Sequence, residues 1–140
     1  MSASKGLTMK QAFQTQRIAT LRTALRARHA ALLVEIRQDL QKSDDDRARL
    51  YADRVHDLED ESVADLLVDL DLAEIDRDLA ELREVEAALD RIEQGSYGTC
   101  ETCDGPIGEE RLLANPAAFR CLDCQAMHEK TYAHPGTPTL

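Results

Sequence analysis

The sequence predicts a mainly α-helical protein: a long antiparallel coiled-coil hairpin on a small globular base with four cysteines and a short C-terminal helix. Leu, Ala, Glu, Asp and Arg dominate the 140 residues, and only 4% are aromatic, which is typical of long helices and coiled coils. Apolar residues recur in steps of three and four along most of the chain. The four cysteines form two close pairs near the C-terminal end.

A first long helix is predicted from about Met9 to Leu40. Its apolar residues fall on one stripe, made by Ile18, Leu21, Leu25, Leu32, Ile36 and Leu40. The segment from Ser43 to Asp46 interrupts this stripe, and the apolar pattern resumes from Leu50 to Leu58. The sequence leaves open whether the helix continues through 43–46 or restarts after it.

A second long helix is predicted from Val63 to Gly95. Its stripe consists of Val68, Leu72, Ile75, Leu79, Leu82, Leu89 and Ile92. Ser62 followed three residues later by Asp65 has the arrangement of a capping box, with Asp in place of Glu or Gln. Gly95 is the expected C-terminal stop, because glycine readily adopts the left-handed conformation that ends helices.

Charge is distributed unevenly along the chain. Residues 1–38 hold seven basic residues and one acid, whereas 57–90 is rich in acids and holds two basic residues, Arg77 and Arg83. Antiparallel pairing of the two helices explains this asymmetry without an outside ligand. A fold-back near Glu59 would place Arg37 near Glu81 and Arg28 near Asp90. The net charge of −10 also opposes direct binding to DNA phosphates.

Four regions are expected along the chain. An N-terminal segment, 1–17, should pack on or near the base, and the coiled-coil hairpin should span 18–95 with an acidic tip around 53–62. The four-cysteine module and the last helix occupy 96–132, followed by a flexible tail, 133–140. No stretch approaches the roughly 20 apolar residues that cross a bilayer, and the start lacks the apolar core of a secretory signal. We expect a cytoplasmic monomer that does not bind membranes.

Two Cys-x-x-Cys pairs predict a zinc site. Cys100 and Cys103 are separated from Cys121 and Cys124 by seventeen residues, a spacing that lets both pairs close on one tetrahedral ion. Four thiolates leave no open coordination position, so the zinc would be structural. A thioredoxin-like redox dithiol is the competing interpretation, but it requires alternating strands and helices that the sequence lacks. Ligation by His128 in place of one thiolate is a further, weaker alternative.

The segment YGTCETCDGPIGEERLLANPAAFRCLDC, preceded by a heptad hairpin, resembles the DksA/TraR family of bacterial transcription factors. The matching positions are Tyr97, Gly98, Cys100, Cys103, Ile107, Gly108, Arg111, Leu112, Pro116, Cys121 and Cys124. The resemblance implies a regulator, not an enzyme, that binds bacterial RNA polymerase. Its coiled-coil tip would enter the secondary channel and modulate initiation.

The resemblance also implies a set of polymerase-contacting residues. Counting back from the first cysteine, the family's tip motif falls on Asp57, Asp60 and Ser62, so two acids are kept and an alanine is replaced. Alternatively, Asp60 and Ser62 only cap the second helix. A placement at Ala52-Asp53-Arg54 requires an insertion. Arg77 matches a family arginine and is a candidate polymerase contact.

One departure from the family concerns guanosine tetraphosphate (ppGpp). The positions that bind this nucleotide in the best-studied members hold Lys, Arg and Lys, whereas this chain has Glu84, Asn115 and Gln125. An acid and two amides do not clamp a polyanion. We therefore expect no family-type ppGpp site.

Two other functions remain open from the sequence. Gre factors share the hairpin plan and use acidic tips to stimulate transcript cleavage, which makes a Gre-like cleavage factor one alternative. A zinc-stabilised adaptor for another protein is the second. The four-cysteine module favours the DksA/TraR family over both.

Overall fold

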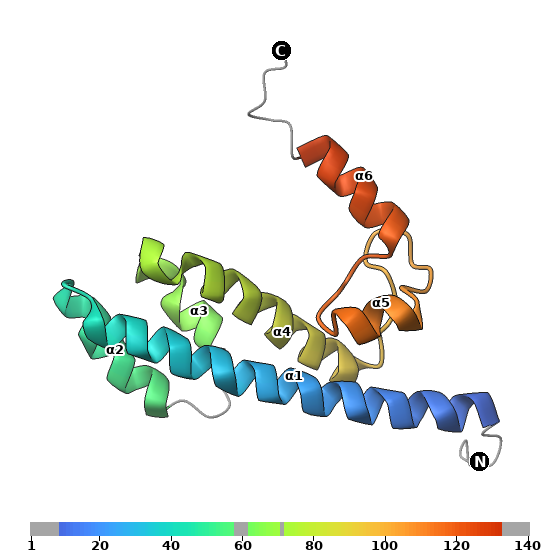
Figure 1. The fold of residues 1–140 in the computed structure, drawn as a ribbon, viewed down its shortest axis with the longest axis horizontal. Helices are drawn as coiled ribbons and strands as arrows, with labels where there is room; N and C mark the ends of the chain where they lie inside the picture. Colours follow the sequence, from blue (N-terminus) through green and yellow to red (C-terminus); the bar gives the residue numbers. More distant parts are fainter. Residues whose placement is uncertain (1–8, 58–61, 71, 133–140) are drawn as a thin grey trace.

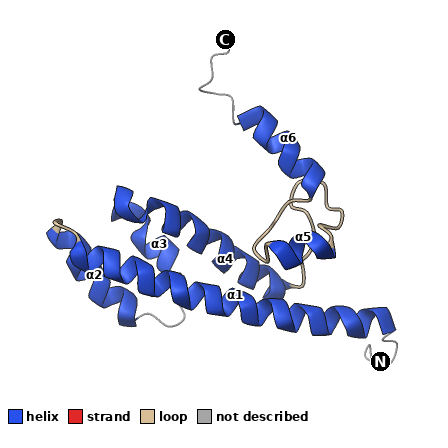
Figure 2. Cartoon of the chain, viewed as in Figure 1, coloured by secondary structure: helices blue, strands red, loops and turns tan. Residues whose placement is uncertain are grey.

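The computed structural model describes residues 9–57, 62–70 and 72–132, and within these ranges its regular elements are helices (Figures 1 and 2). The mainly α-helical class predicted from the sequence is confirmed. The elements are α1 (Met9–Lys42), α2 (Asp46–Asp57), α3 (Val63–Leu67), the 3-10 turns η2 (Val68–Leu70) and η3 (Ala73–Ile75), α4 (Asp76–Gln94), α5 (Glu109–Ala114) and α6 (Leu122–Tyr132). None of these helices combines the length and apolar character needed to cross a membrane.

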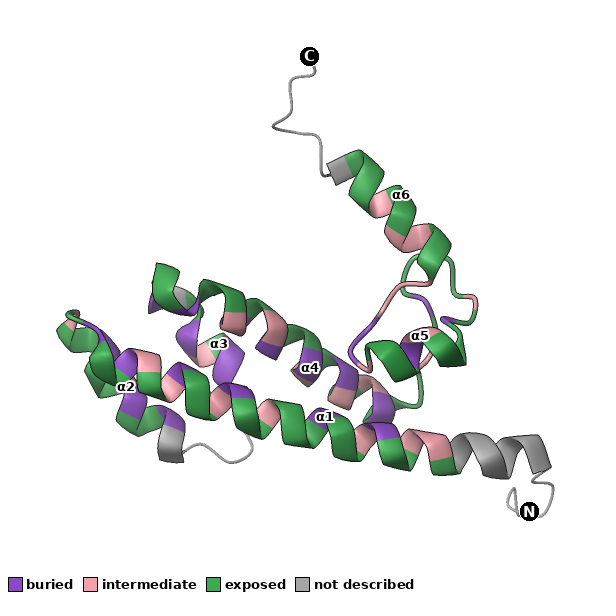
Figure 3. Ribbon diagram, viewed as in Figure 1, coloured by how far each residue is buried: buried purple, intermediate pink, exposed green. Residues whose placement is uncertain are grey.

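Helices α1 and α4 run antiparallel and form the main core of the molecule (Figure 1). Buried residues of both helices, purple in Figure 3, line the side on which the two helices meet. One buried cluster contains Leu25, Leu32, Ile36 and Leu40 from α1 and Leu79, Leu82, Val85, Ala88 and Ile92 from α4. Each fully buried leucine or isoleucine contributes about 1.5–3 kcal/mol. Most residues of the two predicted stripes therefore belong to one continuous seam, which also contains Val85 and Ala88. Val68 of the predicted second stripe is an exception: it is 47% exposed, because the second arm is broken after η2.

An ion pair joins α1 to α4 beside this seam. The Arg28 guanidinium donates two hydrogen bonds to the Glu81 carboxylate, at 2.6 and 2.7 Å, and this hydrogen bonding lowers the pKa of Glu81. The predicted proximity of Arg28 to Asp90 and of Arg37 to Glu81 is therefore wrong. Arg28 and Arg37 are nine positions apart, about 14 Å along a helix, so the register of the two arms differs from the one predicted for a fold-back near Glu59. Glu59 itself lies outside the described residues.

The first arm ends at Lys42, and the chain restarts as α2, which packs back along α1 (Figure 1). The Asp45 carboxylate accepts a hydrogen bond from the Arg47 N–H at 2.8 Å and so caps α2. Ser43 Oγ accepts from the Asp45 N–H at 3.1 Å, and Arg49 donates to the Ser43 carbonyl at 2.7 Å. These bonds stabilise the reversal, which settles the question that the sequence left open at 43–46.

The small residues of α2 face α1. Ala48 and Ala52 have no exposed surface, and Val55 is almost fully buried beside them. Small side chains let two helix axes approach closely. The fold-back of α2 therefore buries apolar surface that a lone helix would leave in water.

The second arm is interrupted, which corrects the prediction of one helix from Val63 to Gly95. Ser62 caps α3, because its hydroxyl accepts a hydrogen bond from the Asp65 N–H at 3.1 Å, as the sequence predicted. Beyond η2, Leu72 has extended backbone angles (φ −105°, ψ 124°) before the chain re-enters η3 and α4. The interruption allows Val63, Ala64 and Leu67 of α3 to be buried in the same core as α4.

Helix α4 ends at Gly95, as predicted. Gly95 has a left-handed backbone (φ 82°), and the Ser96 N–H bonds back to the Arg91 carbonyl at 2.9 Å, the arrangement of a Schellman stop. The base of the molecule follows directly, and α6 extends from it away from the hairpin (Figure 1). Of the predicted N-terminal segment, residues 9–17 are the first turns of α1; residues 1–8 and the predicted tail, 133–140, lie outside the described residues.

A pair of leucine substitutions tests the seam. Leu32→Ala should lower the free energy of unfolding by about 2–5 kcal/mol, because Leu32 is fully buried and its loss leaves a cavity. Leu50→Ala, the matched control, removes the same atoms from a side chain that is 69% exposed and should change stability by less than about 0.5 kcal/mol. Urea unfolding of the zinc-loaded protein measures both. Equal losses would contradict the burial of Leu32 in the core.

Candidate metal centre

The first cysteine pair lies on a tight loop that follows α4. The Ile107 N–H bonds to the Gly98 carbonyl at 2.9 Å, and the Cys100 N–H bonds to the Gly105 carbonyl at 2.8 Å. These bonds fold the segment back on itself, so that Cys100 and Cys103 face the same side. Gly98 has φ 91°, a conformation that favours glycine and explains why the residue stands there.

The second pair lies at the start of α6. Cys121 immediately precedes the helix, and Cys124 is in its first turn. The Arg111 guanidinium donates to the Arg120 carbonyl at 2.7 Å, which fixes the segment that leads to Cys121. The Glu101 N–H donates to the Phe119 carbonyl at 2.9 Å. This last bond joins the loops of the two pairs, so their cysteines converge although seventeen residues separate them.

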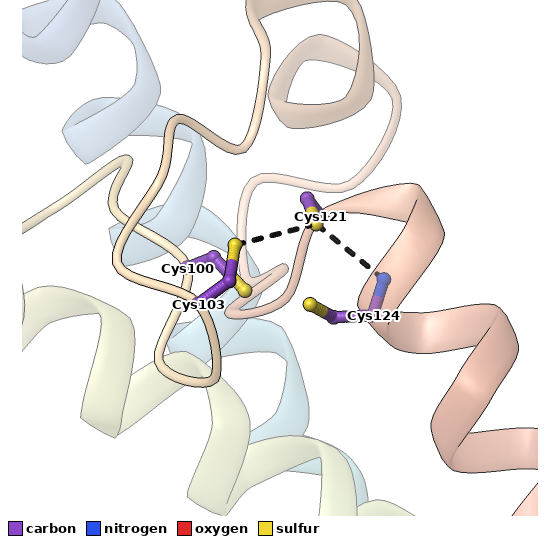
Figure 4. A group of neighbouring side chains, drawn as sticks. All are labelled: Cys100, Cys103, Cys121 and Cys124. Carbon is purple, nitrogen blue, oxygen red and sulfur yellow. Dashed lines mark hydrogen bonds between the residues drawn. The ribbon is translucent and has the colours of Figure 1, made fainter.

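The four sulfur atoms form one compact group (Figure 4). All lie within 4.8 Å of one another, and the Cys103 and Cys121 sulfurs are 3.9 Å apart. Ligands at about 2.3 Å from a tetrahedral zinc ion lie about 3.8 Å apart. The donor set and its spacing therefore fit a single Zn²⁺, as predicted for Cys100, Cys103, Cys121 and Cys124.

Backbone N–H groups point at the sulfurs. Gly105 donates to Cys103 Sγ and Cys124 donates to Cys121 Sγ, both at 3.4 Å. Burial raises the pKa of the Cys100 thiol, but backbone hydrogen bonds from Cys103, Cys121 and Thr102 outweigh that effect, and the pKa falls to about 6. Contacts with the other cysteines raise the pKa values of Cys103 and Cys124, because neighbouring thiolates repel one another. A cation at the centre of the group would favour the thiolate form, which is the ligand form, of all four residues. A bound zinc ion would crosslink the two loops without an open coordination position.

The base is attached to the hairpin through a second small core. This cluster combines Leu21 of α1 with residues around the cysteines, namely Cys100, Ile107, Leu112 and Ala118. Tyr97 contacts both this cluster and the main core, and its hydroxyl donates to the Pro116 carbonyl at 2.7 Å. Burial raises the pKa of Tyr97 to about 12. Arg17 of α1 also pairs with Glu109 of α5 at 2.5 Å.

The geometry defines the class of protein: a helical hairpin whose base is a four-cysteine zinc finger. Residues 95–130 match the family model described as the prokaryotic dksA/traR C4-type zinc finger. The solution structure of a DnaK suppressor protein from Agrobacterium tumefaciens C58 is similar, with a TM-score of 0.54, 30% identity, and coverage of 79% of this chain and 92% of that chain. The chain belongs to the DksA/TraR family.

Curated relatives agree with this assignment. The RNA polymerase-binding transcription factor DksA of Caulobacter vibrioides is 37% identical over 91 residues, which are 65% of this chain and 58% of the relative. The protein of the same name from Escherichia coli K12 is 37% identical over 60 residues, 43% of this chain and 40% of the relative. The matches therefore span about half the length of these relatives.

Of the three predicted tip residues, Asp57 and Ser62 lie alongside the arms in this conformation. Asp60 lies outside the described residues, and Asp57 is the last residue of α2, without a described side chain. Ser62 lies beside the middle of α4, where its hydroxyl donates to Glu86 Oε1 at 2.7 Å. The end opposite the base is formed by the turn at 43–45 and by η2 and η3 (Figure 1). Arg77 is exposed on α4.

Glu84, Asn115 and Gln125 line one open pocket of about 530 Å³ between the hairpin and the base. Sequence counting had associated these three positions only through the family. The same pocket is also lined by Arg111, Arg120 and His128. Their positions in the sequence do not predict this shared location, because it depends on the fold of the base. Arg120 pairs with Glu101 at 3.2 Å and stacks on the Phe119 ring at 4.5 Å. Burial raises the pKa of Glu84.

His128 lies outside the cysteine group. It lines the pocket just described, and the metal-competent cluster among the described residues consists of the four cysteines. His29 lies on α1, where its Nε2 contacts Glu86 Oε2 at 2.9 Å. The geometry thus favours four thiolates over a site of three cysteines and a histidine.

Substitution of one cysteine tests the centre. The purified wild type should contain one zinc ion per chain, and Cys103→Ser should bind zinc at least about tenfold more weakly, since a hydroxyl is a poor replacement for a thiolate ligand. Thr102→Ser is the matched control, because Thr102 is exposed in the same loop and should retain wild-type affinity. Competition with a chromogenic chelator measures both. Unchanged affinity in Cys103→Ser would contradict the four-thiolate site.

Proposed function

We propose that the protein is a regulator, not an enzyme, that binds bacterial RNA polymerase and inserts its coiled-coil end into the secondary channel to modulate initiation. The observation that carries this proposal is the C4 module at 95–130 with a helical hairpin emerging from it. The relatives with this module bear the name RNA polymerase-binding transcription factor. A polymerase partner would act in the bacterial cytoplasm.

The chemistry of the chain supports protein recognition over DNA binding. Its net charge is −10, and several of its arginines are paired with acids within the molecule, as in Arg28 with Glu81 and Arg17 with Glu109. Phosphate backbones require accessible clusters of positive charge. Direct sequence-specific DNA binding is therefore not part of the proposal.

Asp57, Asp60 and Ser62 are the proposed residues of the polymerase-facing end, with Arg77 as a further contact. Two carboxylates near the polymerase active centre would act by their charge on magnesium or on mobile elements there. The zinc ion is proposed to be structural. It fixes the base from which the arm projects, so its role in polymerase binding is indirect.

One set of assays tests this function and separates it from the alternatives. We expect the purified protein to co-purify with bacterial RNA polymerase and to change the lifetime of open complexes. Asp57→Asn with Asp60→Asn should retain binding and lose most of the effect on initiation, because the fold keeps its shape while the two charges are removed. Ser96→Ala is the control, because Ser96 is exposed and lies just beyond the end of α4.

The same double variant distinguishes the outcomes in stalled elongation complexes. Transcript cleavage that depends on the two acids would replace the proposal with a Gre-like cleavage factor. Failure to bind polymerase would leave a zinc-stabilised adaptor for another partner. Competition with a factor that occupies the secondary channel shows whether that channel is the binding site.

We further propose that the pocket lined by Glu84, Asn115 and Gln125 does not provide the family-type ppGpp site. Its cations are engaged within the base, since Arg120 contacts Glu101 and Phe119 and Arg111 bonds to the Arg120 carbonyl. Glu84 adds a carboxylate to the same pocket. A polyphosphate would have to displace these internal contacts.

Three substitutions test whether the family-type ppGpp site is absent. Glu84→Lys, Asn115→Arg and Gln125→Lys together raise the charge of these positions by four units, so ppGpp should enhance the variant's effect on initiation several-fold and leave the wild type unchanged. Lys, Arg and Lys provide the charge-assisted hydrogen bonds that an acid and two amides cannot. Equal enhancement of both proteins by ppGpp would contradict the proposal.

A further inference from the structure

Glu86 holds three segments of the chain together. Its carboxylate lies on α4, is 17% exposed, and accepts hydrogen bonds from Ser62 Oγ at 2.7 Å and from the Val63 N–H at 3.3 Å. On the other side it contacts His29 Nε2 of α1 at 2.9 Å. The start of α3 is therefore tied to the middle of α4 and, through the same carboxylate, to α1.

The contact between Ser62 and Glu86 exists only because the chain folds back. Ser62 and Glu86 are 24 positions apart in the sequence. If α3 and α4 formed one straight helix, this separation would place the two residues about 36 Å apart. The contact of Glu86 with His29 joins α1 to α4 and does not depend on the path of α2 and α3. Glu86 thus has two partners that are specific to the folded-back arrangement, Ser62 and Val63, and one that is not, His29.

Several buried apolar residues form pairs whose members are equidistant from one midpoint, between positions 57 and 58. Ile36 and Leu79 are equidistant from it, as are Leu40 and Ile75, which face each other's helices in the present core. The same midpoint relates Ala52 of α2 to Val63 of α3. Straight arms turning at this midpoint would therefore pair buried residues of α2 with buried residues of α3.

The two interruptions obey the same symmetry. Ser43, which directly follows α1, and Leu72, where the second arm is broken, are equidistant from the midpoint. The end of α1 lies opposite the base (Figure 1). Straightening both arms together would keep the register of His29 with Glu86. It would exchange the contacts of α2 with α1 and of α3 with α4 for contacts between α2 and α3.

We propose that α2 and α3 form a folded-back segment held by Glu86, and that its release converts the molecule into a straight hairpin with residues 57–58 at its far end. Extension moves this end about 21 Å beyond the present turn at Ser43, at 1.5 Å per residue. The folded-back form keeps Asp57 and Ser62 of the proposed tip alongside the arms. This regulation rests on the proposed function, because polymerase would select the extended form.

The distance between Glu35 and Asp53 distinguishes the two forms. Both side chains are exposed, and both positions are nine residues from Asp44. In the folded-back form they lie on neighbouring helices whose axes are about 8–10 Å apart, whereas a continuous helix separates them by about 27 Å. Ketone-bearing residues placed at both sites accept spin labels without touching the zinc cysteines. Pulsed EPR should show the short distance for the free protein, and a long distance alone would overturn the proposal.

A double-variant cycle at Ser62 and Glu86 tests the role of the Glu86 carboxylate. Ser62→Asp keeps an oxygen that can cap α3 and places a carboxylate against Glu86, so the ratio of long to short distances should rise at least about tenfold. Ser62→Asp with Glu86→Gln provides an amide donor for the new carboxylate and should restore the short distance. Ser96→Asp is the matched control and should resemble the wild type.

A second variant acts at the other end of the folded-back segment. Asp45→Ala removes the cap of α2 and favours a continuous helix through 43–46, so it should also increase the long distance. If circular dichroism shows that Ser62→Asp has lost helical structure, Asp45→Ala replaces it as the test. The proposal would be overturned if Asp45→Ala, or a Ser62→Asp variant with full helical content, kept the short distance.

Addition of RNA polymerase separates this inference from the proposed function. Polymerase should shift the labelled wild-type protein to the long distance. Bound protein that keeps the short distance would overturn the regulatory role of the fold-back. If polymerase does not bind while Ser62→Asp and Asp45→Ala still lengthen the free protein, the proposed partner is wrong and the conformational change stands.

Discussion

The convergence of four cysteine sulfurs is the constraint on which the base of the molecule depends. The loops from Gly95 to Cys121 contain only short regular elements, and their core is limited to a few residues around Cys100. A core of this size does not stabilise a fold by itself. Structural zinc contributes about 10–16 kcal/mol in comparable small modules, so metal binding and folding of this region are coupled. The ion also joins the end of α4 to the start of α6, which determines how the last helix leaves the hairpin.

Helix α1 carries this constraint into the hairpin, because it contributes to both cores. Leu21 packs in the zinc module and Leu25, one turn further on, packs against α4. Tyr97 bridges the same two clusters, and the Arg91 side chain of α4 lies 5.9 Å from the Phe119 ring of the base. The direction of the arms is therefore set by the base over several contacts. A change in the cysteine site would alter the orientation of residues far from it along the hairpin.

The charges of the arms determine alignment more than stability. Arg28 and Glu81 are both partly exposed, and exposed pairs contribute about 0.2–1 kcal/mol. Glu86 differs because it is largely enclosed: burial raises its pKa, and hydrogen bonds from His29 and Ser62 reverse that effect and lower it. This carboxylate on α4 has three partners, two at the start of α3 and one on α1, and so links the path of α3 to the packing of α1 on α4. The same set of apolar residues accommodates a folded-back and a straight arrangement, which is the physical basis for a conformational equilibrium.

The sequence by itself determined the helical class, the zinc ligands and the ends marked by Ser62 and Gly95, because these follow from local spacing, capping and metal geometry. Leu32 and Leu82, for example, were assigned to the core from periodicity alone and are fully buried. Tertiary structure decided the paths of α2 and α3 and the partner of Arg28. The apolar stripe continues on both sides of Ser43 and Leu72, so periodicity predicts the same buried faces for straight and for reversed arms. Which arrangement forms depends on contacts between distant residues, such as Ser62 with Glu86, and on how closely Ala48 and Ala52 approach α1.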